Sequence, residues 1–308
     1  MEDSFDSSQT IDKQRLKALS RRSDAKGLLQ LASHLLALVG SVTLVVLAGW
    51  SLWLLPAMVL HGLLLIFLFA PLHETIHRTA FARRWLNDLV AWPCGLVLML
   101  PPEYFRAFHF AHHRHTQDPA CDPELSVPKP TTRAAYIWRL TGLPYWRERV
   151  TTILTHAVGR VEASFLPERM HASIVREARA VVAVWIGLAG ISIATGSAAV
   201  LTLWILPALL GQPFLRAYLL AEHTGCPEVP DMLRNTRTTR STAFVRWLAW
   251  NMPYHVEHHA YPAVPFHALP DAHEVIKDRI AFLAPGYLAV QREIVAGLGP
   301  SQTAAVSS

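Results

Sequence analysis

Two long stretches of the chain contain no charged side chain. Residues 27–73 lack Asp, Glu, Lys and Arg, and so do residues 180–215, which continue through Arg216 to residue 220. One membrane crossing needs roughly 20 apolar residues, so each stretch has room for two helices. Glycine and serine near positions 49–51 and 196–197 favour a turn inside each stretch. We therefore predict an all-α integral membrane protein with four spans in two hairpins, near residues 28–49, 53–72, 180–197 and 200–222.

A third uncharged stretch, residues 89–102, is too short for a full crossing. It contains Pro93 and ends with two consecutive prolines, which interrupt a regular helix. We expect this stretch to form a re-entrant or interfacial segment.

Positively charged side chains are distributed unevenly around the predicted spans. The hairpin tips near residues 49–53 and 196–200 contain no Lys or Arg, whereas residues 1–27, 74–179 and 234–246 contain many. Lys and Arg accumulate on the cytoplasmic side of membrane proteins. We therefore expect both termini and both large polar segments to be cytoplasmic. The net charge of +5 then reflects orientation, because no basic stripe with interleaved aromatic residues indicates nucleic-acid binding.

The overall composition excludes several classes of protein. Hydrophobic residues make up 52% of the chain and charged residues 17%, which excludes a disordered protein or a polar binding module. The acidic, polar start of the chain predicts no cleaved signal peptide. Three scattered cysteines form neither a disulfide framework nor a CxxC metal pair. Histidine, with 16 copies, is the unusual component.

Most of the histidines fall into four clusters. On a helix, positions i, i+3 and i+4 share one face, so HxxxH and HxxHH patterns present adjacent imidazoles. Imidazole is a ligand for transition metals, and nine such nitrogens suffice for two ions. Each cluster lies close to the cytoplasmic end of a predicted span or in a cytoplasmic segment, so all four can meet on one side. The predicted metal ligands are His73, His77, His109, His112, His113, His223, His255, His258 and His259.

The remaining histidines have other expected roles. We expect His34 and His61 to be packed or hydrogen-bonded between spans, and His115 to lie off the face of its cluster. The others, His156, His171, His267 and His273, are expected to be solvated or to support the ligands. Carboxylates near the clusters can orient the rings, and Asp122 and Glu222 are the strongest candidates. The weaker candidates for this role are Glu74, Asp118 and Glu257.

The clusters resemble the three histidine boxes of the membrane fatty acid desaturase and hydroxylase superfamily, with His223 as the additional ligand. The resemblance covers residues 28–285, which leaves residues 1–27 and 286–308 as tails. It implies a mushroom-like fold with a helical cytosolic cap, a non-haem diiron centre, and O2-dependent oxidation of C–H bonds in long hydrocarbon chains. The first box has the spacing of bacterial branches, so we expect a bacterial inner membrane location.

Two departures from animal acyl-CoA desaturases affect the expected site. An Asn that helps to bind one iron in those enzymes is replaced here by Leu219, and Asn251 is our candidate for a similar role. No cytochrome b5-like HPGG is present. Electrons are therefore expected from a separate ferredoxin-, rubredoxin- or cytochrome b5-type protein with its reductase.

The substrate is expected to enter from the bilayer along an apolar tunnel. Phe105, Phe108 and Trp250 are candidate tunnel residues near the clusters. Candidate residues for an anionic head group are Arg106, Arg114, Arg234, Arg237 and Arg240.

Several reactions remain open from the residues alone. A desaturase, a hydroxylase, a terminal-alkene-forming decarboxylase and a carotenoid-type ketolase all share this ligand set. A metal-ion transporter is a more distant alternative, since transporters place their ligands near the bilayer midplane. Here the clusters lie at the ends of the predicted spans.

Overall fold

The computed structural model describes residues 11–299, and these residues are predominantly helical. Four helical stretches are long and apolar enough to cross a membrane, namely Asp24–Ala48, Leu54–His77, Glu168–Thr195 and Leu201–His223. The predicted all-α architecture with four spans is confirmed. The third span begins 12 residues earlier than expected, at Glu168 rather than residue 180. No Pro or Gly separates the apolar stretch from the charged residues before it, so one helix continues through both.

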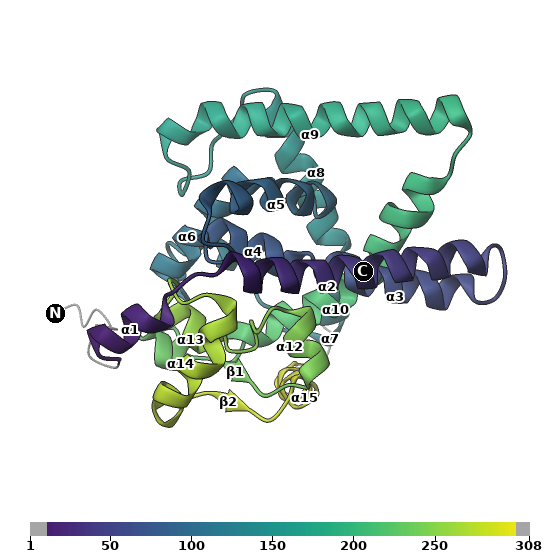
Figure 1. Ribbon diagram of the computed structural model, residues 1–308. Helices are drawn as coiled ribbons and strands as arrows, with labels where there is room; N and C mark the ends of the chain where they lie inside the picture. The colour runs from purple at the N-terminus through teal and green to yellow at the C-terminus, as the bar shows by residue number, and fades with distance from the viewer. Residues whose placement is uncertain (1–10, 300–308) are drawn as a thin grey trace, which may run out of the picture.

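The four spans form two hairpins that point in the same direction. The first hairpin consists of α2 (Asp24–Ala48), α3 (Leu54–Ile66) and α4 (Phe69–His77), and the second consists of α9 (Glu168–Thr195), η3 (Leu201–Ile205) and α10 (Leu206–His223). Figure 1 shows both hairpin tips at the right-hand end, with the short helices gathered at the opposite end. The hairpins therefore form a stem and the short helices form a cap.

Prolines explain the interruptions in two of the spans. Pro71 has no amide hydrogen, and its ring clashes with the carbonyl of residue 67 in a regular helix. The chain breaks there between α3 and α4, with tighter bonds such as Ala70 N–H to the Phe67 carbonyl at 2.9 Å. Pro207 similarly follows the π-helical turn η3, whose wider spacing absorbs the missing hydrogen bond.

Two glycines set the packing between the hairpins. A Cβ atom on Gly62 of α3 would lie 2.0 Å from the Pro207 carbonyl oxygen, and one on Gly211 of α10 would lie 2.2 Å from the Gly62 carbonyl oxygen. Neither position has space for a side chain. Small residues at such crossings let backbones approach closely inside a membrane. The close approach of α3 and α10 aligns His73 and His77 with His223 at the cap end.

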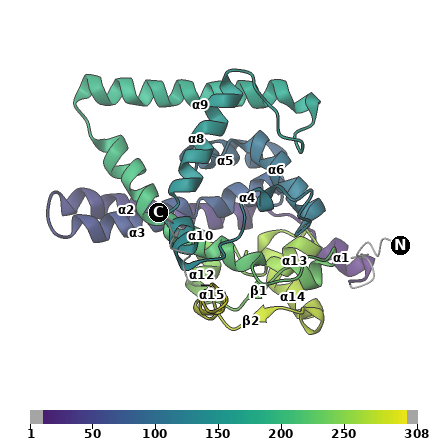
Figure 2. The ribbon, with the colours of Figure 1, turned by 180° about the vertical axis from the view of Figure 1, so that it is seen from behind.

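The cap surrounds the end of α4 from two sides. Figures 1 and 2 show α5, α6 and α8 on one side of α4, and α12, α13, α14 and α15 on the other. The helices of the first part are α1 (Lys13–Leu19), α5 (Arg84–Val97), α6 (Pro102–His115), η2 (Pro123–Ser126), α7 (Arg133–Leu140) and α8 (Leu143–Ala157). Those of the second part are α11 (Met232–Asn235), α12 (Ala243–Leu248), α13 (His255–Ala260), η4 (Phe266–Ala268), α14 (Leu269–Ile276), η5 (Lys277–Arg279) and α15 (Tyr287–Ala296). One short parallel pair joins β1 (Thr238–Thr239) to β2 (Leu283–Ala284).

Three segments differ in detail from the sequence-based expectation. Residues 89–102 are not one segment, because they form the second half of α5 and the extended turn before α6. The N-terminal tail contains α1, and its flanking Ile11 is buried. The C-terminal tail contains α15, whose Val290 and Ile294 are buried against the residues around α10. An apolar face on each short helix explains this packing. Residues 1–10 and 300–308 lie outside the described part of the chain.

Candidate metal centre

Nine histidines from four separate segments meet at the junction of stem and cap. They come from the end of α4, the second half of α6, the end of α10 and the short helix α13. Seven of the nine are buried, with exposed fractions of 7% or less, and His77 and His113 are partly buried. These are the nine residues predicted as ligands, and the structure brings all of them together in two adjoining groups.

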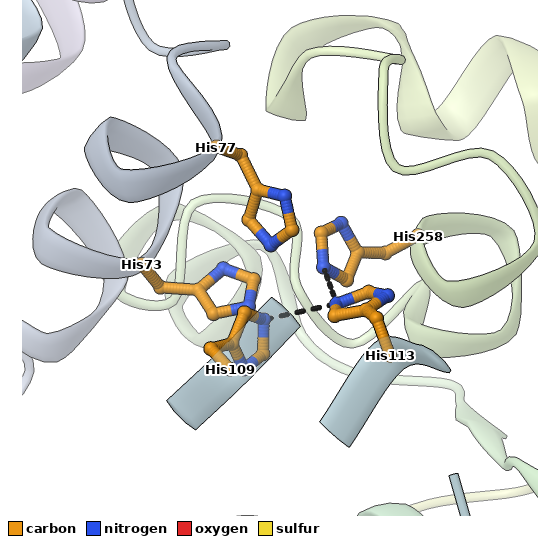
Figure 3. Close-up of side chains that lie close together, drawn as sticks. All are labelled: His73, His77, His109, His113 and His258. Carbon is orange, nitrogen blue, oxygen red and sulfur yellow. Dashed lines mark hydrogen bonds between the residues drawn. The ribbon is translucent and has the colours of Figure 1, made fainter. Parts of the chain in front are cut away.

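The first group contains five histidines. The ligand atoms of His73, His77, His109, His113 and His258 all lie within 4.8 Å of one another. Figure 3 shows the five rings directed toward a common space between α4, α6 and α13. The Nε2 atom of His113 is 2.9 Å from that of His109 and 3.0 Å from that of His258.

The second group contains four histidines. The ligand atoms of His112, His223 and His259 lie within 4.8 Å of one another, and the His255 Nε2 atom is 3.1 Å from that of His223. The groups adjoin each other, because the His113 and His259 rings stack with centroids 4.2 Å apart. The HxxHH patterns therefore divide between the groups, with His109 and His113 facing one and His112 the other.

The nitrogen atoms suit metal ions. Nitrogen ligands about 2.1 Å from an ion at right angles to each other are roughly 3 Å apart, which is the spacing of the closest Nε2 pairs. Several ring nitrogens are also buried without a hydrogen-bond partner among residues 11–299, including those of His73, His77 and His259. A buried polar atom without a partner is costly, and a bound cation would satisfy these atoms.

The electrostatic environment favours neutral, ligating imidazoles. Burial, together with repulsion from the other histidines, holds the pKa values of His109, His113 and His258 well below the ordinary 6.5. The pKa values of His255 and His259 are lowered for the same reasons. Only the neutral ring carries the free electron pair that binds a metal.

Three of the four segments present their histidines at a helix C-terminus. His77 ends α4, His223 ends α10, and His112 and His113 lie in the last turn of α6. The C-terminal end of a helix carries partial negative charge from its unpaired carbonyl groups. The convergence of three such ends therefore favours cations at the centre.

Asp122 orients one of the rings. Its carboxylate oxygens lie 3.0 and 3.1 Å from Nδ1 of His112, and they also accept hydrogen bonds from the backbone amides of Gln117 and Glu124. Burial alone would raise the pKa of Asp122, but the interaction with His112 and the two amides lowers it. The carboxylate is thus held ionised, and it directs Nε2 of His112 toward the second group.

The other candidate carboxylates occupy different positions. Glu222 Oε1 lies 3.5 Å from Nδ1 of His255, beside the second group. Glu74 accepts hydrogen bonds from Thr79 and from the Phe266 amide, and Glu257 contacts His273 and Thr238. None of these partners belongs to the nine histidines.

Asn251 does not take the suggested role at the metal centre. Its amide donates to the Phe266 carbonyl at 3.1 Å, and its backbone lies in the left-handed region with φ of 58°. A turn between α12 and α13 requires this conformation, which Asn tolerates better than most residues. Here Asn251 is a turn residue rather than a neighbour of the centre.

Sequence reasoning missed two groups that hold the histidine rings. The Asn235 carbonyl lies 3.3 Å from Nδ1 of His223, and the Thr116 hydroxyl lies 3.2 Å from Nδ1 of His259. Thr116 directly follows a histidine cluster, so its position was a usable signal. Asn235 reaches the centre from a separate loop, and no local pattern indicated it.

The histidines outside the clusters behave largely as expected. Nε2 of His34 bonds to the Leu64 carbonyl at 2.9 Å, and His61 bonds to Ser41 and to the Leu203 carbonyl. Both therefore connect spans, as predicted. His115 lies away from the nine, near Asp118 and Cys121.

An elongated cavity leads from the cap surface to the centre. Its outer part has a volume of about 180 Å³ and is lined by Phe105, Phe108 and His223 among others. A smaller inner pocket contacts His73 and His255, one from each group. The two parts share a wall made of Phe69, His112, Glu124 and Leu219. Of the candidate tunnel residues, Trp250 is fully buried against Phe266 and lines neither part.

The cationic residues of the cavity are not those expected. The cavity wall carries Lys129, Arg139, Arg149 and Arg216. None of the five arginines suggested from the sequence lines it, since Arg106 pairs with Asp88 and Arg237 bonds to the Ala221 carbonyl. A signal was available, because Arg216 is the one charge in a predicted span, and such charges usually have a function.

The fold and the site together define a helical membrane protein with a buried histidine centre at the end of a partly apolar cavity. The chain belongs to the fatty acid desaturase family, whose sequence model matches residues 62–291, well over half of the chain. The match confirms the resemblance in the histidine boxes and shows that the protein is an oxidoreductase.

Individual relatives agree with the family. An sn-1 oleoyl-lipid 12-desaturase of Picosynechococcus sp. is 26% identical over 261 residues, covering 78% of this chain and 74% of that protein. A sphingolipid delta(4)-desaturase of Drosophila melanogaster is 23% identical, covering 75% of this chain and 68% of the relative. A dihydrorhizobitoxine desaturase of Bradyrhizobium elkanii is 27% identical, covering 82% and 75%. The substrates named for these relatives differ widely, so the family alone does not identify one.

Proposed function

We propose that this protein is a membrane-bound, O2-dependent diiron oxidoreductase that oxidises C–H bonds of a long-chain fatty acyl or related lipid substrate, by desaturation or hydroxylation. The observation that carries the proposal is the convergence of nine buried histidines, in two adjoining groups, on a partly apolar cavity. The desaturase names of the relatives support desaturation as the first reaction to test.

The two histidine groups would each hold one iron ion. The first ion would be bound by ligands among His73, His77, His109, His113 and His258, and the second by His112, His223, His255 and His259. Two irons supply the electrons for O2 activation and the oxidising power that an unactivated C–H bond requires. Imidazole suits iron, and the buried rings supply it in the neutral form.

The protein contributes position and dryness to the reaction. Phe69 and Leu219 line both parts of the cavity, so a hydrocarbon chain passing between them lies beside His112. Phe67 and Met252 extend the apolar wall past the histidines. Holding one carbon near the reacting centre removes much of the entropic cost of the reaction, and apolar walls exclude water.

The centre also needs electrons from outside this chain. We propose a separate ferredoxin-, rubredoxin- or cytochrome b5-type donor with its reductase, because the sequence carries no cytochrome b5-like motif. The Lys and Arg distribution supports an orientation with the cap and both termini in the cytoplasm of a bacterium, at its inner membrane.

Product analysis tests the proposal. The chain is expressed in a bacterial host, and its lipids are compared by mass spectrometry with those from cells expressing His112→Ala. Loss of two hydrogen atoms per acyl chain indicates desaturation, and gain of one oxygen atom indicates hydroxylation. Ketolation and decarboxylation give different masses. Full activity in protein shown to be free of iron contradicts the proposal, as does identical lipid composition with wild type and variant.

A further inference from the structure

Arg216 is an unpaired cation in the cavity wall. It lies in α10, inside the fourth candidate span, and none of the ion pairs within residues 11–299 includes it. Its buried Nε atom has no hydrogen-bond partner among the described residues. The guanidinium stacks on the Tyr145 ring at 4.4 Å. A membrane-embedded charge without a counter-ion is expensive, so a ligand of opposite charge is the natural partner.

The neighbouring charges leave this cation available. Arg149 contacts the same Tyr145 ring, at 5.8 Å, and it pairs with Glu148. The cavity contains two further carboxylates, Asp122 and Glu124, both close to His112. Asp122 is already occupied by His112 and by backbone amides.

The remaining cations of the wall are engaged elsewhere. Lys129 donates to the Gln117 side chain, and Arg139 donates to the Pro128 carbonyl. Arg216 is therefore the cavity cation with the least satisfied side chain.

The helix places Arg216 in line with the centre. Residues 216, 219, 220 and 223 all line the cavity, and their spacing puts them on one face of α10. Arg216 and His223 are seven residues apart, which is about 10 Å along a helix. Phe105 and Phe108 from α6 make the wall between them apolar.

The cavity is bordered by a helix suited to the membrane surface. Ile137 and Trp138 of α7 are 63% and 56% exposed, directly beside Arg139 of the wall. Trp and large aliphatic residues exposed on a short helix are typical of the membrane interface. An amphiphile from the bilayer therefore fits this cavity better than a water-soluble ligand.

We infer that Arg216, supported by Arg149, binds the anionic end group of an amphiphilic substrate, a carboxylate or a phosphate, whose hydrocarbon chain runs past Phe105 and Phe108 toward His112 and His223. This inference rests on the proposed function and deepens it, since it names the substrate as an anionic lipid. It also places the oxidised carbon at a fixed distance from the anionic end.

Binding of three matched probes tests the inference. Decanoate, decyl phosphate and decanol share one chain length and differ in their end group. Their affinities are measured by calorimetry with the full-length, metal-loaded protein in neutral detergent. Wild-type protein is expected to bind at least one of the two anions more tightly than decanol. The preferred anion distinguishes a free acid from a phospholipid-type substrate.

Variants identify the responsible side chain. Arg216→Gln is expected to weaken binding of the preferred anion about 10- to 100-fold, because a hydrogen-bonded charge pair is lost. Decanol affinity and metal content should stay unchanged, and Arg216→Lys should retain part of the anion preference. Arg160→Gln is the matched control, since Arg160 is exposed and lies outside the cavity wall.

Two results overturn the inference. One is equal anion affinity in wild type and Arg216→Gln. The other is an absence of any anion preference in the wild-type protein, which requires no variant to fold. Binding is measured without turnover, so the outcomes stay separate from those of the proposed function. Anion preference without O2-dependent oxidation contradicts the proposed function alone, and oxidation without anion preference contradicts this inference alone.

Discussion

The carboxylate of Asp122 contacts Nδ1 of His112 through both oxygens, at 3.0 and 3.1 Å, ten residues along the chain. Such a contact fixes the ring and raises its basicity toward a metal. We expect Asp122→Asn to lower metal affinity about 10- to 100-fold. Iron content after equilibration with a graded chelator measures the change. Asp118→Asn is the control, because Asp118 contacts none of the nine histidines; equal retention of iron in both variants would contradict the assignment.

Two histidines separated by a single residue should behave differently. His113 has its Nε2 atom close to those of His109 and His258, whereas His115 lies outside both groups. We expect His113→Ala to remove most of the metal bound to the first group and to abolish oxidation. His115→Ala should retain both. Metal analysis of the two purified variants checks this contrast, and similar losses in both would argue against the grouping.

Acid should destabilise the metal-free protein. The pKa values of His109, His113 and His258 are well below 6.5 in the folded protein because of burial and mutual repulsion, whereas unfolding restores the ordinary value. The unfolded chain therefore binds more protons below about pH 6.5, and the free energy of unfolding falls as the pH decreases through that point. Above it, these groups contribute no pH dependence.

Thermal unfolding of chelator-treated protein between about pH 5 and pH 8 measures this effect. The unfolding temperature should be constant at the upper end of the range and fall at the lower end. Metal-loaded protein should resist acid better until protons displace the metal. An unfolding temperature that rises on acidification would contradict the prediction.

The crossing of α3 and α10 should tolerate no side chain. A Cβ at position 62 would lie 2.0 Å from a backbone oxygen of Pro207, so Gly62→Ala forces the helices apart. We expect a loss of about 1–3 kcal/mol in the free energy of unfolding. Gly187→Ala on α9 is the matched control, since a Cβ there meets nothing within 4 Å. Unfolding temperatures in detergent compare the two, and equal values would exclude close packing at Gly62.

Much of the architecture follows from short-range patterns. Uncharged runs and turn residues predicted the four spans, and His34 and His61 were correctly expected to connect them. The helical spacing of His109, His112 and His113 correctly placed them on neighbouring faces, although the pattern did not show that His112 faces a different group. That division depends on which other segments approach α6, and local spacing does not encode it.

The misplaced residues have a common physical reason. Asn251 was assigned by analogy of position, yet its backbone conformation serves a turn. The suggested head-group arginines were chosen for being basic and near the clusters, whereas the cavity wall is built from α7, α8 and α10. Cavity walls arise from tertiary packing, so proximity in sequence is a poor guide to them. Arg216 was the exception, because a charge inside an apolar run is visible without a structure.

The order of the four histidine-bearing segments along the chain has a consequence for biosynthesis. The first ligands lie in α4 and the last lie in α13, after the fourth span. A ribosome therefore finishes both hairpins before His255, His258 and His259 exist. Neither group can be complete until translation has passed these residues, so metal loading must follow membrane insertion. Cells that make this protein must keep its partial site unoccupied by competing metals during that interval.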